Sequence, residues 1–150
     1  MKPIYRPATR APTWIVVLHA AALLAHEGAH RLLGVDLAFW QAVFAYSVIV
    51  AGPLVALALL WVRPRAGFAL LALSMAGALL FTVYHHYVGV SPDHVAHLPP
   101  GQARGLFRWT AAALALLEAA GVVAGWRGWR NTRTLAIPHD PDPNTEEAAE

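Results

Sequence analysis

Four long apolar runs constrain this chain more than any other feature of its sequence. Each holds about the 20 consecutive apolar residues that a helix needs to cross the hydrocarbon core of a bilayer. They dominate a chain that is 57% hydrophobic and only 13% charged. The runs are approximately Thr13–Leu33, Phe39–Val62, Ala66–Val88 and Leu106–Trp126. We therefore expect an all-α fold, an integral membrane four-helix bundle over residues 13–130, with the lipid bilayer as its surroundings.

The segments outside these runs predict how the chain is oriented. We expect residues 1–12 to be a short cytoplasmic segment and residues 131–150, rich in Pro and Glu, to be a disordered tail. Positive side chains favour the cytoplasmic side, and one side of the bundle carries only Arg31, Arg104 and Arg108. The other side carries Lys2, Arg6, Arg10, Arg63, Arg65, Arg127, Arg130 and Arg133. We therefore expect both termini in the cytoplasm of a bacterium, with the bundle in its inner membrane. Because the basic residues serve topology, no nucleic-acid partner is expected, and the oligomeric state is left open.

Alternate crossing of the membrane brings most of the histidines to one face. The first run ends, the third ends and the fourth begins on the same side, whichever way the bundle is inserted. Six of the eight histidines lie near those points: His26, His30, His85, His86, His94 and His97. Ionisable groups cost about 2.5–3.5 kcal/mol each at the centre of a membrane helix. A shared metal ion is the simplest reason for gathering them.

The segment His26-Glu27-Gly28-Ala29-His30 carries the chemistry of a metal site. Residues four apart lie on one face of a helix, so His26 and His30 are placed to bind one metal ion, with Glu27 as a general base for a metal-activated water. We expect zinc. The candidates for a third ligand are Asp93, His85, His86, His94 and His97. The chain has no cysteine, which excludes disulfides, iron–sulfur clusters and thiolate zinc sites.

Two ionisable residues lie deeper than this segment. His19 precedes His26 by two turns on the same helix face, about 10 Å further into the membrane, and Glu118 falls near the middle of the fourth run. An unpaired glutamate there would be costly. We therefore expect His19 and Glu118 to face the bundle interior and to interact, either as a structural pair or as part of a proton path.

The order of these residues resembles the site-2 protease family of intramembrane zinc metalloproteases. The likeness rests on His26-Glu27-x-x-His30, on Ala51-Gly52-Pro53-Leu54 in the second run, and on an aspartate after the third. It implies that His26, His30 and an aspartate (Asp93 at the corresponding place) bind zinc. It further implies that Glu27 activates water to hydrolyse a peptide bond in a membrane-embedded protein substrate. The Leu-Asp-Gly that carries the third ligand in that family is replaced here by Pro92-Asp93-His94.

Other functions fit the same residues. Imidazole binds several transition metals, so a histidine-rich protein that binds or transports zinc, copper or iron is one alternative. A membrane oxidase with two irons is another. A haem protein with axial histidines from the first and third runs is a further alternative.

Overall fold

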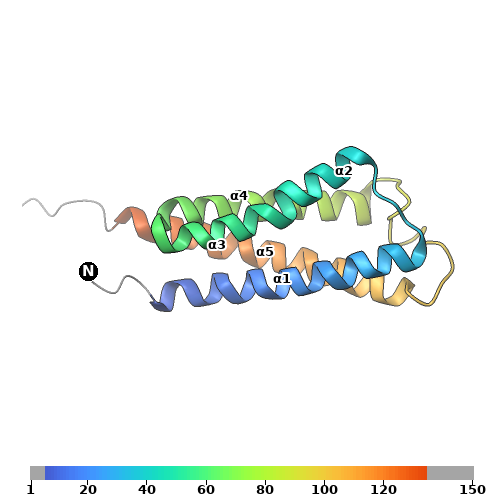
Figure 1. Ribbon diagram of the computed structural model, residues 1–150, viewed down its shortest axis with the longest axis horizontal. Helices are drawn as coiled ribbons and strands as arrows, with labels where there is room; N and C mark the ends of the chain where they lie inside the picture. The colour runs from blue at the N-terminus through green and yellow to red at the C-terminus, as the bar shows by residue number, and fades with distance from the viewer. Residues whose placement is uncertain (1–5, 135–150) are drawn as a thin grey trace, which may run out of the picture.

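The computed structural model describes residues 6–134, and every element in this part of the chain is helical. The elements are α1 (Arg6–Leu33), α2 (Phe39–Phe44), η1 (Ala45–Ala51), α3 (Gly52–Val62), α4 (Pro64–Val83), η2 (Tyr84–Val88) and α5 (Arg104–Thr134). The π-helical segments η1 and η2 continue their neighbours without a break, so the chain forms four helical rods (Figure 1). The all-α prediction is confirmed.

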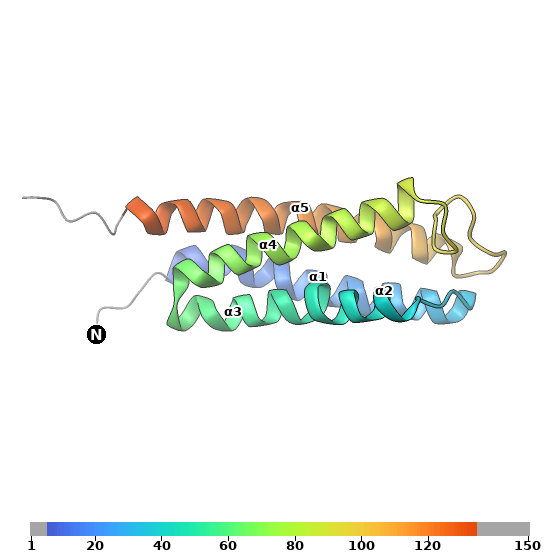
Figure 2. The same ribbon diagram turned by 90° about the horizontal axis from the view of Figure 1, so that it is seen from above.

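Consecutive rods run roughly antiparallel to each other (Figure 1). α4 packs between α3 and α5, and α1 packs along α5 with a smaller contact to α3. The described chain begins and ends at the same end of the bundle, where the turn between α3 and α4 also lies (Figures 1 and 2). The end of α1, the end of η2 and the start of α5 therefore meet at the opposite end. This is the arrangement predicted from alternate crossing.

Three of the rods are long and apolar enough to cross a membrane: Phe39–Val62, Pro64–Val88 and Arg104–Thr132. The first predicted run also forms a long helix, α1, but it is not among these three within the described residues. Its polar residues, including His19, His26, Glu27 and His30, lower its mean hydropathy. By length and composition, three helices of the described residues are therefore candidates to cross a membrane. The fourth long helix, α1, has 28 residues and is not a candidate by these criteria.

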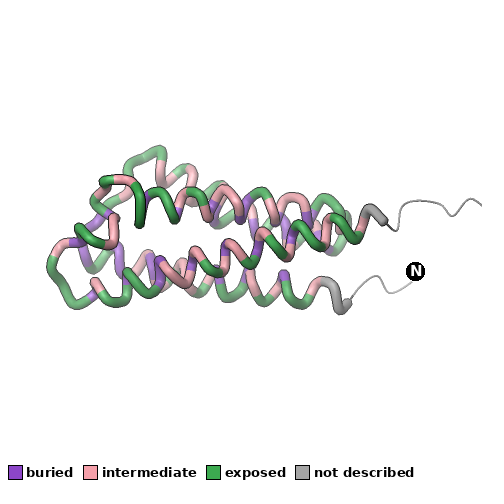
Figure 3. The backbone as a smooth tube through the Cα atoms, turned by 180° about the vertical axis from the view of Figure 1, so that it is seen from behind, coloured by how far each residue is buried: buried purple, intermediate pink, exposed green. Residues whose placement is uncertain are grey.

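The bundle places apolar side chains outside and several polar ones inside. Leu24, Leu73, Leu80 and Leu116 are exposed, whereas Ser74, Thr82, His19 and Glu118 are buried. Figure 3 shows the buried positions where the rods face one another. A leucine-rich outer surface around a partly polar interior is the distribution that a bilayer favours, because polar groups cost free energy in contact with lipid.

Close helix contacts depend on small residues. A Cβ on Gly125 of α5 would lie 2.6 Å from the backbone nitrogen of Ala72 in α4. A Cβ on Gly52 would lie 2.6 Å from the Cβ of Ser74. Both contacts require glycine, because no real Cβ approaches other atoms so closely. Small residues at such contacts are typical of membrane helix pairs.

The Gly52-Pro53 pair marks a widened turn. Proline has no N–H to donate, so the helical hydrogen-bond ladder is disturbed ahead of it. The helix is π-helical over η1, and the Gly52 N–H donates to the Ser47 carbonyl, five residues back. π-helical turns occur frequently at functional sites. The distortion ahead of this pair thus takes the form of a π-helix.

The predicted boundary of the C-terminal tail is wrong by a few residues. α5 continues to Thr134, so residues 131–134 are helical and not part of a disordered segment. Residues 135–150, and residues 1–5 of the predicted N-terminal segment, lie outside the described residues.

Candidate metal centre

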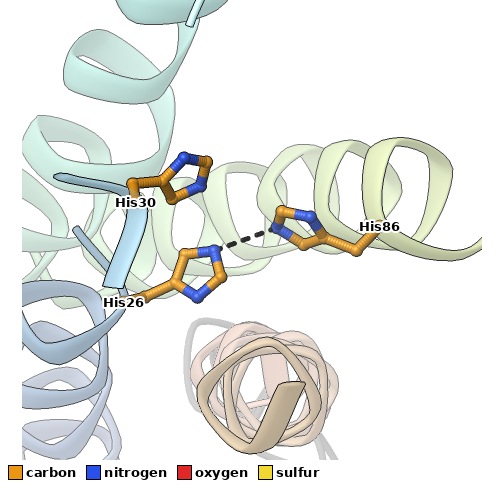
Figure 4. A group of neighbouring side chains, drawn as sticks. All are labelled: His26, His30 and His86. Atoms are coloured by element: carbon orange, nitrogen blue, oxygen red, sulfur yellow. Dashed lines mark hydrogen bonds between the residues drawn. The ribbon is translucent and has the colours of Figure 1, made fainter. Parts of the chain in front are cut away.

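Three buried histidines meet at the end of the bundle that carries the long loop. His26 and His30 come from the last two turns of α1, and His86 comes from η2. Figure 4 shows the three imidazoles directed towards one another. One ring nitrogen from each lies within 4.8 Å of the others, and the His26 and His86 Nε2 atoms are 3.2 Å apart. Of the residues proposed as a third ligand, His86 is therefore the one that the structure places beside the motif histidines.

The second nitrogen of each ring is held by a hydrogen bond. His30 Nδ1 donates to the Val35 carbonyl at 3.0 Å, and His86 Nδ1 donates to the Asp93 carbonyl at 3.0 Å. His26 Nδ1 lies 2.8 Å from Thr110 Oγ1. The Thr110 hydroxyl donates its own proton to backbone carbonyls of α5, so it accepts from His26. All three rings therefore carry their proton on Nδ1, which leaves the Nε2 lone pairs free.

Free lone pairs at this spacing favour a bound cation. With both protons on Nδ1, two Nε2 lone pairs face each other at 3.2 Å, and a bound cation relieves their repulsion. Tetrahedral zinc with Zn–N bonds of 2.0–2.1 Å places its nitrogen ligands about 3.3 Å apart. The His26–His86 pair already has this spacing, and a ring nitrogen of His30 lies within 4.8 Å of both. The residues present therefore fit a zinc-sized ion.

The local sequence after α1 positions His30. Gly34 has φ +64°, a conformation that glycine adopts readily. The Gly34 N–H donates to the Arg31 carbonyl and the Val35 N–H to the His30 carbonyl, which is the Schellman arrangement of a helix end. The same reversal brings the Val35 carbonyl to His30 Nδ1. The turn at Gly34 therefore both ends α1 and orients the His30 ring.

The loop after η2 folds back and positions His86. The Val95 N–H donates to the His86 carbonyl at 3.0 Å, and Ser91 Oγ donates to the His85 carbonyl at 2.8 Å. Asp93 is buried in this loop, with Oδ2 3.7 Å from His86 Nδ1 and without a hydrogen-bond partner. Asp93 therefore lies behind the His86 ring, on the side away from the converging nitrogens. It orients His86 and is not placed as a direct ligand.

Three other predicted histidines lie apart from this group. His85 packs against the Phe81 ring and accepts a hydrogen bond from Gln41 Nε2 at 3.2 Å. His94 and His97 stack on each other in the loop, with ring centroids 4.7 Å apart. None of the three belongs to the group of converging nitrogens found among the described residues. The neighbouring pair His85-His86 is thus divided between two environments.

Glu27 lies at the edge of the site. Its carboxylate accepts a hydrogen bond from Arg31 Nε at 2.9 Å, one turn along α1, and both side chains are partly exposed. Glu27 also lines the cavity that contains the three histidines. The carboxylate is therefore near the centre but is held by Arg31.

A second polar cluster lies deeper in the bundle. His19 Nε2 is 3.3 Å from Glu118 Oε1, and Thr82 Oγ1 donates to the same oxygen at 3.1 Å. The other oxygen, Glu118 Oε2, is buried without a hydrogen-bond partner. The predicted contact between His19 and Glu118 is confirmed, and Thr82 is an additional member that the sequence did not indicate.

A cavity of about 330 Å³ opens beside the histidines. Its polar lining residues are His26, Glu27, His30, Thr82, His86 and Asp93. The rest of the lining is mainly apolar and comes from α1, η1, α4 and α5. A metal ion at the three Nε2 atoms would therefore have an accessible side, which is the arrangement of a catalytic site; a structural zinc site is closed by four protein ligands.

Several residues of the site were not predicted. The Phe107 ring lies 4.4–5.3 Å from the three imidazole centroids and forms an apolar floor beneath them. Thr110, which accepts from His26, precedes Glu118 by two turns. Thr110 and Glu118 lie on one face of α5, which is otherwise apolar, and this pattern in the sequence could have indicated that the face points inward.

No protein-family model matches this chain, and comparisons with curated proteins and with solved structures found no significant match. The resemblance to site-2 proteases therefore rests on the motif residues alone.

Proposed function

We propose that this protein is a membrane metallohydrolase that binds one zinc ion through His26, His30 and His86. The observation that carries the proposal is the convergence of three Nε2 lone pairs whose Nδ1 protons are already bound elsewhere. Partners on Nδ1 fix the ring orientation and raise the basicity of the ligand, and metal-binding histidines almost always have them. Any buried imidazole needs a partner for its N–H, so the feature that favours a metal is the convergence of the three other ring nitrogens.

Three imidazoles with an accessible fourth side favour hydrolysis over storage. When bound, zinc in such a site supplies a Lewis acid that activates water at neutral pH. The accessible side faces the cavity, where a carbonyl group of a substrate can approach. This supports an enzyme that cleaves an amide or ester bond. Cleavage of a peptide bond, as implied by the motif, remains a prediction.

Glu27 is the group placed to move the proton. Its carboxylate lines the same cavity and lies next to His26 in the chain. To act as a base it must leave Arg31, to which it is bound at 2.9 Å. It then takes a proton from the attacking water and gives it to the leaving amine or alcohol as the acyl bond breaks. Arg31 holds the carboxylate near the site until substrate enters.

Metal analysis of the detergent-purified protein tests the metal site. Plasma mass spectrometry should find about one zinc per chain, lost in the His26→Ala, His30→Ala and His86→Ala variants. His85→Ala is the matched control, because His85 adjoins His86 but contacts Gln41 and Phe81. Zinc loss in His85→Ala with retention in His86→Ala would overturn the assignment.

Hydrolysis is tested with p-nitrophenyl acetate as a small reporter. Glu27→Gln should retain zinc and lose hydrolysis by about 100-fold or more, because general-base catalysis contributes on the order of 10²–10⁴. Arg31→Gln should retain most of the activity, since Arg31 only holds the carboxylate. Zinc-loaded wild-type protein without esterase activity above that of the His86→Ala variant would favour metal binding or transport instead.

A further inference from the structure

The cavity beside the three histidines is long in the direction of the helices. It extends along α1 from Ala20 to His30, and a separation of ten residues corresponds to about 15 Å of helix. Ile49 and Val50 of η1 line the cavity on the side across from α1. Leu114 of α5 lines the cavity deeper in the bundle than the histidines. The shape is therefore that of a slot running from the loop end of the bundle into its apolar middle.

The slot is polar at one end and apolar at the other. The three histidines, Glu27 and Asp93 all lie at the loop end. Ala20, Leu23, Ile49 and Leu114 line the deeper part, where Thr82 is the polar exception and its hydroxyl donates to Glu118. A molecule that fills this slot has a polar group at one end and a hydrocarbon portion at the other.

The slot opens sideways, towards the surroundings of the bundle. Leu24 of α1 and Tyr46 of η1 line it and are 76% and 64% exposed. α1 packs mainly along α5, so it leaves the neighbouring η1 largely uncovered on this side. In a bilayer, the outer surface at this depth contacts lipid chains. A hydrophobic molecule therefore reaches the slot directly from the membrane, without passing through water.

We propose that the substrate is a single-chain acyl amphiphile, a lipid whose ester or amide bond lies at the histidines and whose hydrocarbon chain lies in the slot. This inference rests on the proposed hydrolase function. The water oxygen forms a bond to the acyl carbon, the bond from that carbon to oxygen or nitrogen breaks, and Glu27 passes the proton to the leaving group. The products are a fatty acid, whose chain occupied the slot, and an alcohol or amine.

Alkyl hydroxamic acids test the slot by binding rather than by turnover. The hydroxamate group binds zinc, so acetohydroxamate reports on the metal, and homologues with four to ten carbons report on the slot. In the wild-type protein, affinity should rise about threefold to fourfold for each added methylene. Ala20→Phe fills the deep part of the slot and should abolish this rise while leaving acetohydroxamate binding unchanged.

Matched variants distinguish binding of the alkyl chain in the slot from partition of that chain into the detergent micelle. Ala21→Phe places the same ring on the exposed face of α1 next to Ala20, so it should keep the wild-type dependence on chain length. Val50→Trp narrows the slot from the opposite wall at a partly exposed position, and it replaces Ala20→Phe if that variant does not fold.

The outcomes distinguish this inference from the proposed function. Loss of the chain-length dependence in Ala20→Phe or Val50→Trp, with retention in Ala21→Phe, supports the acyl slot. Equal dependence in all variants overturns the acyl slot but not the metal site, provided that acetohydroxamate binds. A protein that hydrolyses a quenched transmembrane peptide at the same rate with Ala20→Phe would instead be a protease. If zinc-loaded wild-type protein does not bind acetohydroxamate, the hydrolase proposal fails as well.

Discussion

Replacing Thr110 by valine tests whether the hydrogen-bond partner of His26 contributes to metal binding. Valine has nearly the shape of threonine, so the substitution removes the hydroxyl that accepts the His26 Nδ1 proton at 2.8 Å and little else. The Leu106 and Phe107 carbonyls lose the bond from Thr110 but remain in the helix. We therefore expect α5 to stay folded and the His26 ring to lose its fixed orientation.

The expected loss of zinc affinity depends on which other hydrogen-bond acceptor His26 can reach. Removing a hydrogen-bond partner of a metal ligand weakens metal binding by about 10–100-fold. In this site the Phe107 carbonyl, which accepts from the Thr110 hydroxyl at 3.0 Å, becomes available as a substitute acceptor. The loss should therefore be near the lower limit, about tenfold in the dissociation constant for zinc, or about 1.4 kcal/mol.

Competition with a chromophoric chelator measures this change in detergent solution. Thr132→Val is the matched control, because Thr132 donates to the Trp129 carbonyl on the same helix far from the site. It should bind zinc as the wild type does. Wild-type affinity in Thr110→Val would refute the claim that the Nδ1 partners hold the rings for a metal.

Five further results are expected. Gly34→Ala should destabilise the protein by about 1 kcal/mol in thermal unfolding and weaken zinc binding, because Gly34 has φ +64°. Gly28→Ala, whose Cβ would meet no heavy atom within 4 Å, should not weaken zinc binding. Chelation with EDTA should lower the Tm of the wild type, and an equal decrease in His86→Ala would contradict a role for this site. Zinc occupancy should fall as the pH is lowered, because protons compete with the metal for the imidazole nitrogens, and occupancy independent of pH would exclude histidine ligands. Glu118→Gln should be tolerated, whereas Glu118→Ala should cost about 1–3 kcal/mol in thermal unfolding, because it leaves His19 and Thr82 unpaired.

Much of the architecture could be predicted from the apolar runs alone. Their lengths predicted the helices, and alternate crossing predicted which helix ends would meet. The first helix shows where this approach is less secure: the same residues that form the site, such as His26 and Glu27, lower the hydropathy of α1. The tail was predicted to begin at residue 131 because the end of the chain is rich in Pro and Glu, whereas α5 continues to Thr134.

The site was predictable only in part, for a physical reason. The spacing of His26 and His30 follows from helix geometry, and the contact between His19 and Glu118 follows from the cost of burying a lone carboxylate. The choice of His86 over His85 depends on the widened turn of η2, which no pattern in the sequence specifies. The position of Asp93 depends on how the loop folds back after Pro92, and the partner role of Val35 belongs to a backbone carbonyl, which no side-chain pattern can indicate.

X-ray absorption at the zinc edge tests the central claim most directly. The zinc-loaded protein should show three imidazole nitrogens at 2.0–2.1 Å and one further light-atom ligand. His86→Ala should lose this zinc signal altogether, whereas His85→Ala should keep the signal of all three imidazoles. A spectrum dominated by carboxylate oxygens, or one unchanged by His86→Ala, would contradict a metal centre built from His26, His30 and His86.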